Sequence, residues 1–487
     1  MPKQFIKTFV QKYRKLISPL KSENIWHYLP HFYIILIVAT VVRVFQLFTV
    51  PYANGWDGAF YQMQLQHWLE TGHLHTQNFS LIYLLLKPLT LLSNPLTAYK
   101  SIAVLASAFF SALVFSFAKK HTNVKIAYLV TMYSIASPFI LFFSHQFTKN
   151  MLGIDAVLLF LISDKKRTQL IISFVLAAIS HRIALAIIAF HIILNLLFKA
   201  KLKKTMLLVL ATVALIPLIG FIPGLPNVFD YLRVVADFDM TIYFAPLEFL
   251  KVWDIDTQLW YWYVETGIFI GTIAAGTILL WKNKTIRPAI TIIISLLIPI
   301  FEFNSGSMGY RLFLNAVLLS FIIMPFLLAK IKYHSPIIVI IVLIFSFNEY
   351  RNDKFDPPIH LYEAIANKAI THVNKNTTDK TLIIAHKGLK EQIIMQSHHD
   401  ALNWQPDSTA SETTTYRITH GVTDAEIITL QGKHQSEWIK LYSHYHLTTE
   451  ENWQNLLIAM QEEGMNERIK NIKTWQNPHE IRPAYLR

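Results

Sequence analysis

Asp57 is the residue whose type and setting most directly suggest chemistry. It lies between Gly55 and Gly58, a few residues after an apolar stretch that ends near Val50. The flanking glycines allow a tight turn, from which a carboxylate can face a cleft and accept a proton from a hydroxyl nucleophile. Aspartate is also a favoured N-cap, which would make Asp57 the cap of a helix beginning near Ala59. The two roles do not exclude each other.

Basic side chains at the ends of apolar segments are candidates for binding an anion. Arg311 ends the polar stretch EFNSGSMGYR and begins an apolar segment, so its guanidinium is suited to bidentate contact with a phosphate. Arg182 stands beside His181 between two apolar segments, and Lys149 follows His145 in another short polar connection. The simpler alternative for each base is a long side chain at a helix end that reaches the membrane surface.

Glu70, His73 and His75 raise the alternative of a divalent metal site. The spacing of the two histidines places their rings on opposite faces of a strand, or splayed apart on a helix, which does not favour a shared metal. Glu70 also fits a plain role at the end of an interfacial helix. We therefore expect no metal cofactor.

Hydropathy defines the elements that must position these groups. The chain has 487 residues, of which 53% are hydrophobic and 15% charged. Several apolar stretches approach the roughly 20 residues that cross a bilayer, which predicts a polytopic helical membrane protein with about eleven spans. The predicted spans are 32–50, 99–118, 126–143, 151–163, 170–180, 183–198, 206–221, 259–281, 290–301, 312–329 and 336–347.

The distribution of charge predicts the orientation. With the N-terminus in the cytoplasm, the inner connections carry about three times as many lysines and arginines as the outer ones, as the positive-inside rule requires. Asp57 and most acids of the membrane half then lie outside. The net charge of +13 arises in this membrane half, so it indicates a membrane and not a nucleic-acid partner.

The sequence divides into a membrane part and a soluble part. We expect a basic cytoplasmic segment over 1–31, a membrane module over 32–221 with its first outer loop at 51–98, further spans over 222–349, and an outer α/β domain over 350–487. In the last domain, the patterns predict strands at 379–385 and 414–421 and helices at 388–399 and 447–464. Thr448 and Glu451 have the spacing of a capping box.

Two further bases lie in apolar surroundings. Arg43 lies within the first span, where a charge is costly unless it faces protein, so we favour a structural pairing with Asp155 or Glu265. Lys87 lies in an apolar interfacial segment, where reaching the lipid headgroups is the simpler role.

Three stretches resemble the GT-C glycosyltransferases, which use polyprenyl-phosphate-linked sugars and include protein mannosyltransferases and lipid A aminoarabinose transferases. GWDGAFYQMQLQHWLETGHLHTQNFSLIYLLLKPLTLL (55–92) resembles the first outer loop of the family, which has an acid just after the first span. SHQFTKNMLGIDAVLLFLI (144–162) resembles the second outer loop and fourth span, and ISHRIALAII (179–188) resembles a recurring turn with small residues and histidine. Many relatives carry a second acid in the second outer loop, whereas SHQFTKN has none.

The resemblance implies an inverting transferase that moves a sugar from a polyprenyl phosphate to an envelope glycan, lipid or protein. Asp57 would be the general base. Asp237 and Asp239, in an aromatic-rich segment, and Glu70 would be acceptor-side contacts. The phosphate would be held by Arg311, Arg182, His181, Lys149 and His145.

Two alternatives stay open at this point. A lipid-linked oligosaccharide polymerase or ligase has similar spans and loops. A transporter or non-catalytic scaffold would place its ionisable groups near the membrane midplane and often shows related halves, whereas here they gather at one face. The expected location is the bacterial cytoplasmic membrane, in contact with its lipids, with the C-terminal domain outside.

Overall fold

The computed structural model describes most of the predicted helical segments. The described residues are 23–48, 56–72, 74, 80–163, 167–199, 260–302, 308–331, 337–344, 357–377, 381–385, 389–397, 400–402, 415–420, 422, 424–431, 438–442, 445–466 and 468–469. The predicted span 206–221 lies outside these residues, as do Asp237 and Asp239.

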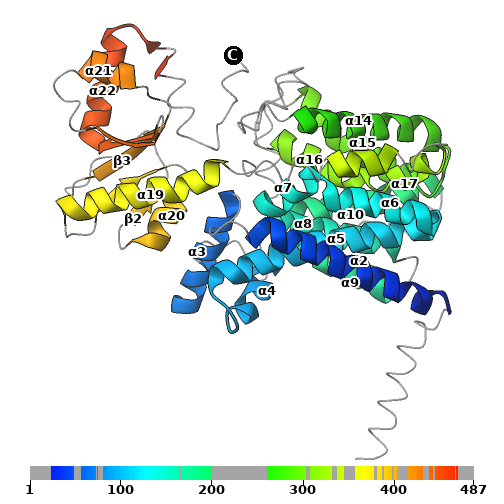
Figure 1. The fold of residues 1–487 in the computed structure, drawn as a ribbon. Coiled ribbons are helices and arrows are strands. Elements are labelled where there is room, and N and C mark those ends of the chain that lie inside the picture. Colours follow the sequence, from blue (N-terminus) through cyan, green and yellow to red (C-terminus); the bar gives the residue numbers. More distant parts are fainter. Residues whose placement is uncertain are drawn as a thin grey trace, which may run out of the picture.

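The membrane half is a bundle of helices, with α3 and α4 at one end (Figure 1). Its helices are α2 (Glu23–Phe48), α3 (Trp56–Thr71), α4 (Leu81–Leu89), α5 (Pro95–His121), α6 (Val124–Ala136), α7 (Pro138–Gln146), α8 (Thr148–Ile162), α9 (Arg167–Ser180), α10 (Arg182–Lys199), α14 (Trp260–Leu280), α15 (Arg287–Glu302), α16 (Met308–Ser320) and α17 (Met324–Leu328).

The helix lengths bear on the number of spans. Within the described residues, two helical segments are long and apolar enough to cross a membrane alone, Pro30–Phe48 and Pro95–His121. Counting α6 and α7 together as one broken span makes three. The other apolar helices have 10–17 residues, which is short of a straight crossing, so about eleven spans stays a prediction.

Local sequence explains where these helices begin. Asn94 caps α5, since its side chain accepts the Thr97 N–H at 2.8 Å, and Pro95 occupies the first helical position. Asn123 caps α6 in the same way through Ile126 at 3.0 Å. Capped starts after each turn fix where α5 and α6 enter the bundle.

The predicted single span 126–143 is wrong in one respect, because it is two helices. α6 ends at Ala136, α7 begins at Pro138, and the two helices are bent by 57°. The physical reason is Pro138, which has no N–H to continue the helical ladder and restricts the residue before it. Ser137 accordingly has an extended backbone, with φ −68° and ψ 120°.

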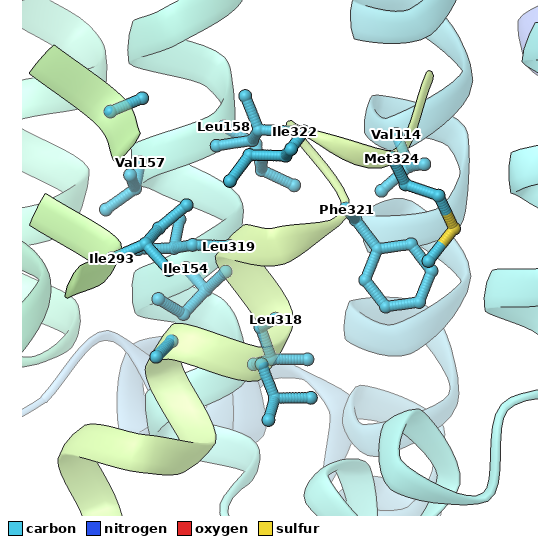
Figure 2. Packing of buried hydrophobic residues seen from close by; sticks show 14 of the residues in the cluster. Val114, Ile154, Val157, Leu158, Ile293, Leu318, Leu319, Phe321, Ile322 and Met324 are labelled. Atoms are coloured by element: carbon cyan, nitrogen blue, oxygen red, sulfur yellow. The ribbon is translucent and has the colours of Figure 1, made fainter. Parts of the chain in front are cut away.

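The bundle core is made of aliphatic and aromatic side chains from helices far apart in the chain. Ile154 and Val157 of α8 pack with Ile293 of α15 and with Leu319 of α16 (Figure 2). At the periphery, α2 leaves Phe45 68% exposed, as expected of a helix that faces lipid.

The C-terminal domain is a mixed α/β fold. Within its described residues, five strands have the order β2-β1-β3-β5-β4, with β1 parallel to both β2 and β3 and the other pairs antiparallel. Its elements are α19 (Pro357–Asn376), β1 (Leu382–Ile384), α20 (Leu389–Gln396), β2 (Asp400–Leu402), β3 (Thr415–His420), α21 (Asp424–Gln431), β4 (Ile439–Tyr442), β5 (Tyr445–Thr449) and α22 (Glu450–Glu462). The predicted strands and helices of this domain are found, in shorter form.

The capping box prediction is wrong by one residue. Thr448 belongs to β5 and pairs with Arg417, whereas Thr449 caps α22 by accepting the Asn452 N–H at 3.3 Å. Beneath this turn the buried Arg417 donates from Nη2 to Glu450 at 2.8 Å. Burial lowers the pKa of the Arg417 guanidinium, and the bond to Glu450 raises it.

The two halves meet close to the first outer loop. α20 of the C-terminal domain packs against α3, the helix that begins at Trp56 (Figure 1). The domain therefore covers part of the segment that carries Asp57.

We predict that this domain and the α14–α15 turn lie on opposite sides of the membrane. The chain contains no cysteine, so single cysteines can be placed at two exposed lysines, Lys375 on α19 and Lys284 in the turn. A membrane-impermeant maleimide should label Lys375→Cys in cells with a permeable outer layer, and Lys284→Cys only after the membrane is opened. Equal labelling of both before opening would contradict the topology.

Candidate functional site

The predicted first outer segment, residues 51–98, is anchored by aromatic side chains. Tyr61 of α3 is buried, and its ring lies 6.1 Å from that of Tyr83 on α4 and 5.7 Å from that of Tyr99 on α5. Leu65 and Leu86 complete this small core. α3 begins at Trp56 and not near Ala59, so the predicted N-cap role of Asp57 is wrong: Asp57 is the second residue of the helix, and its side chain is outside the described part of the structure. The tyrosine cluster therefore fixes the helix whose first turn carries Asp57.

The second outer segment is joined to this cluster. Phe147 separates α7 from α8, and the first residue of α8 is Thr148. The Thr148 hydroxyl donates to the Ser144 carbonyl at 2.8 Å and lies 3.2 Å from the Tyr99 hydroxyl. Lys149, the next residue, is half-buried. One buried hydroxyl pair thus connects the segment that carries Lys149 with the cluster beneath α3.

The turn between α9 and α10 reaches the same end of the bundle. The Ser80 hydroxyl, just before α4, donates to the carbonyl of Ser180 at 2.8 Å. His181 caps α10 by accepting the Ile183 N–H on Nδ1 at 3.3 Å, and Arg182 begins that helix. Both His181 and Arg182 are half-buried.

A glycine allows α8 to approach this turn closely. A Cβ at Gly153 would lie 2.9 Å from Cβ of Ala184 and 3.0 Å from Cβ of His181. Only a residue without a side chain fits at that separation. The second outer segment and the His181–Arg182 turn are therefore held together by direct helix contact.

The structure brings together three of the four predicted segments. The segments of Asp57, Lys149 and His181–Arg182 meet at one end of the bundle through the contacts above. Arg311 lies in α16, and its side chain, like that of His145 in α7, is outside the described residues. The complete phosphate clamp therefore stays a prediction.

Glu70 and Lys87 lie at the surface of the first outer segment. Glu70 is exposed and accepts a hydrogen bond from Gln66, one helical turn earlier, at 2.9 Å. Lys87 is exposed, and its ammonium group lies 4.1 Å from the centre of the Trp68 ring. This cation–π contact links α3 to α4, a role that the expected contact with headgroups does not include.

Two buried ionisable residues near this end were missed as site candidates. Lys100 on α5 is 3% exposed, and its ammonium group lies 5.6 Å from the centre of the Phe48 ring. Asp155 on α8 is also 3% exposed, and neither carboxylate oxygen has a hydrogen-bond partner among the described residues. It lies two helical turns after Thr148, on nearly the same face. In the sequence, the signal for both Lys100 and Asp155 was a charged side chain within an apolar segment.

The expected structural role of Arg43 agrees with its burial and its bonds within the bundle, whereas a direct pairing with Asp155 or Glu265 stays a prediction. Arg43 is 1% exposed and interacts electrostatically with the fully buried Glu265 of α14. Its Nη1 donates to Gln46 at 2.6 Å, and its Nη2 donates to the carbonyl of Ser134 at 3.3 Å. These contacts are structural in character, because one lies within α2 and the other joins α2 to the end of α6.

A bound metal ion would need several ligand side chains close together. Within the described residues, three or more histidine, aspartate or glutamate side chains do not gather at any point. His73 and His75 lie outside those residues.

Comparison with solved structures places the fold. The oligosaccharyltransferase of Archaeoglobus fulgidus, solved with zinc and sulfate, superposes with a TM-score of 0.50 at 11% identity, over 75% of this chain and 62% of its own. ArnT from Cupriavidus metallidurans in the apo state gives a TM-score of 0.53 at 10% identity, over 85% of this chain and 97% of ArnT. No protein-family model and no curated protein sequence matches the chain.

Both of these proteins are GT-C fold glycosyltransferases, and the chain has their fold. The resemblance noted from three short stretches is confirmed at this level, and the structural likeness extends beyond residues 32–221. The chain spans less than two thirds of the oligosaccharyltransferase.

We predict that Gly153→Ala disturbs the candidate site through helix spacing. The added Cβ must push α8 away from Ala184 and His181, which should cost about 1–3 kcal/mol, as overpacking does. The melting temperature in detergent should fall by several degrees. Gly271→Ala is the matched control, because a Cβ at Gly271 meets nothing within 4 Å. An unchanged melting temperature in Gly153→Ala would contradict the close packing.

Proposed function

We propose that this chain, which has the GT-C glycosyltransferase fold, is an inverting membrane glycosyltransferase. It takes a sugar from a polyprenyl-phosphate donor and transfers it to a glycan, lipid or protein of the cell envelope. The observation that carries the proposal is the convergence of three polar outer segments, joined by the Tyr99–Thr148 and Ser80–Ser180 contacts, at one end of an apolar bundle. The site is on the outer face of the bacterial cytoplasmic membrane.

Asp57 is the general base in this proposal. Transfer with inversion needs a carboxylate that takes the proton of the acceptor hydroxyl while its oxygen attacks the anomeric carbon. The lipid tail keeps the donor phosphate at the membrane surface, so the base must lie just outside a span. The position of Asp57 at the start of α3, a helix fixed by the Tyr61 cluster, supports this role.

Basic groups stabilise the phosphate that leaves. Charge builds up on the polyprenyl phosphate as the glycosidic bond breaks, and cationic donors aimed at it lower the barrier. Arg311, Arg182 with His181, and Lys149 with His145 supply these donors. The contacts that bring the α9–α10 turn and the start of α8 to the first outer segment support the role of Arg182 and Lys149.

Asp155 is a further acid to consider, because the second outer loop has none. Its carboxylate has no hydrogen-bond partner among the described residues, although it is buried. A buried carboxylate with no partner is expensive to keep and is often functional. We assign it the orientation of the acceptor hydroxyl or of the Asp57 carboxylate.

The C-terminal domain acts on the acceptor side. It packs on α3 through α20, so an acceptor that reaches Asp57 passes beside it. Glu70, Asp237 and Asp239 are the further acceptor contacts that we propose. No cofactor is needed for the base mechanism, and a divalent metal is the alternative that a metal-dependence assay decides.

The second candidate function is transfer of a lipid-linked oligosaccharide in place of a single sugar. The likeness to an oligosaccharyltransferase favours it, whereas the match covers 97% of ArnT against 62% of the oligosaccharyltransferase. Incubation of purified protein with several polyprenyl-phosphate sugars and one lipid-linked oligosaccharide, followed by mass analysis of the consumed donor, separates the two.

We predict that Asp57→Asn abolishes transfer and leaves the fold intact. Asparagine keeps the size of the side chain but has no basic oxygen, so the rate should fall on the order of 10²–10⁴. Because Asp57 lies inside the first turn of α3, neither Asn nor Ala at this position removes the N-cap, so yield and melting temperature should survive in both variants apart from the loss of a favourable charge near the helix N-terminus. Full activity in Asp57→Asn would eliminate the base assignment.

We predict that Arg182→Ala weakens donor binding. Loss of a charge-assisted hydrogen bond to phosphate should raise the KM for the donor roughly tenfold or more. Lys284→Ala, which removes an exposed base at the α14–α15 turn, is the control and should leave the KM unchanged. Equal KM values for both variants would remove Arg182 from the phosphate site.

A further inference from the structure

The break between α6 and α7 leaves backbone groups that need partners inside the bundle. In a continuous helix the Ser134 carbonyl would accept the N–H of residue 138, but Pro138 has none. The first N–H groups of α7 also lack helical acceptors. Each such group is costly where water is excluded.

Arg43 of α2 bonds to one of the carbonyls at the break. Its Nη2 donates to the Ser134 carbonyl at 3.3 Å, which replaces the missing proline N–H. The guanidinium is 1% exposed, so this contact lies within the bundle and not at the membrane surface.

Glu265 of α14 satisfies the amide side. Its Oε2 accepts the Phe139 N–H at 3.0 Å, and its Oε1 accepts the hydroxyl of Ser137 and that of Tyr133. Ser137 in turn accepts the Ile140 N–H on Oγ at 3.2 Å and the Leu141 N–H on its carbonyl at 3.1 Å. The N–H groups of Phe139, Ile140 and Leu141 therefore all have acceptors, and Pro138, the first residue of α7, has no N–H.

Close packing of α14 holds Glu265 at this point. A Cβ at Gly276 would lie 2.2 Å from Cγ2 of Ile323, so α14 touches the start of α17 where only glycine fits. Glu265 and Arg43 thus bond to backbone groups on the two sides of the break.

We propose that Glu265 is a positioning residue for transfer, acting through α7. α7 packs against α3 and leads directly to Phe147 and Thr148, and Thr148 meets Tyr99 beneath the helix that carries Asp57. The direction in which α7 leaves the break sets where this segment lies. Glu265 thus fixes the second outer segment relative to the first, although it belongs to neither. The inference rests on the proposed function for its kinetic part alone.

Hydrogen exchange tests the positioning without any substrate. In Glu265→Ala the amides of residues 139–151 should exchange roughly tenfold to hundredfold faster, because a buried acceptor is lost. Peptides from α9 and from the C-terminal domain should not change. Thr266→Val is the matched control, since Thr266 is the next residue of α14, is buried, and has a hydroxyl without a hydrogen-bond partner among the described residues.

If Glu265→Ala does not fold and cannot be purified, the conservative variant Glu265→Gln tests the same contacts. Glu265→Gln keeps the shape and one carbonyl acceptor, so residues 139–151 should exchange faster than in the native chain and slower than in Ser137→Ala plus Glu265→Gln. Exchange of 139–151 unchanged in every Glu265 variant would overturn the proposal.

Transfer measured per folded molecule tests the consequence for the reaction. The rate should fall roughly tenfold to hundredfold in Glu265→Ala, as a small misplacement of reacting groups does, and recover in part in Glu265→Gln. Faster exchange with an unchanged rate would overturn the link to transfer. If the native chain transfers no sugar from any donor tested, the proposed function fails, and the exchange result alone decides whether Glu265 fixes α7.

Discussion

A proline inside an apolar bundle is the constraint on which the arrangement of the candidate site depends. Pro138 has no N–H to donate to the helical hydrogen-bond pattern. The carbonyl and amide groups around it lie where water is excluded. Arg43 from α2 and Glu265 from α14 each bond to a backbone group on one side of the 57° bend. The first helix and the second half of the membrane domain are thereby tied to the same break.

This arrangement explains why distant segments meet at one end of the bundle. The bend redirects α7 toward α3, and the short connection at Phe147 then starts α8 beside Tyr99. From there Gly153 brings α8 against the α9–α10 turn. Hydroxyls and small residues make these links, so the segments approach closely without burying further charge. A transporter would be expected to use its buried charges in transport, whereas Arg43 and Glu265 are bonded to backbone.

The sequence predicts the helices better than it predicts their ends and partners. Apolar length located nearly every described helix of the membrane half, whereas α19 and α21 of the C-terminal domain were not predicted. A charge in the first span indicated a buried structural role for Arg43, which its bonds to Gln46 and Ser134 support. The bend was missed because 126–143 is mostly apolar and carries no charge, although Pro138 was the signal. Lys100 was passed over because burial depends on which ring packs over it. For Asp57, sequence placed the residue at the start of a helix, but what its carboxylate faces depends on tertiary packing.

The position of Arg43 has a consequence for how the protein is made. α2 is synthesised first and has only 22% of its apolar window buried, so it meets lipid on most sides from the start. The Arg43 guanidinium can bond to the Ser134 carbonyl only after α6 has been inserted. It can approach Glu265 only after α14, much later in the chain, has been synthesised. Until then a charge lies in the hydrocarbon without its final partners, which is costly. The nascent chain should therefore keep its first helix at the insertion machinery, or near the headgroups, until the second half of the bundle has been translated.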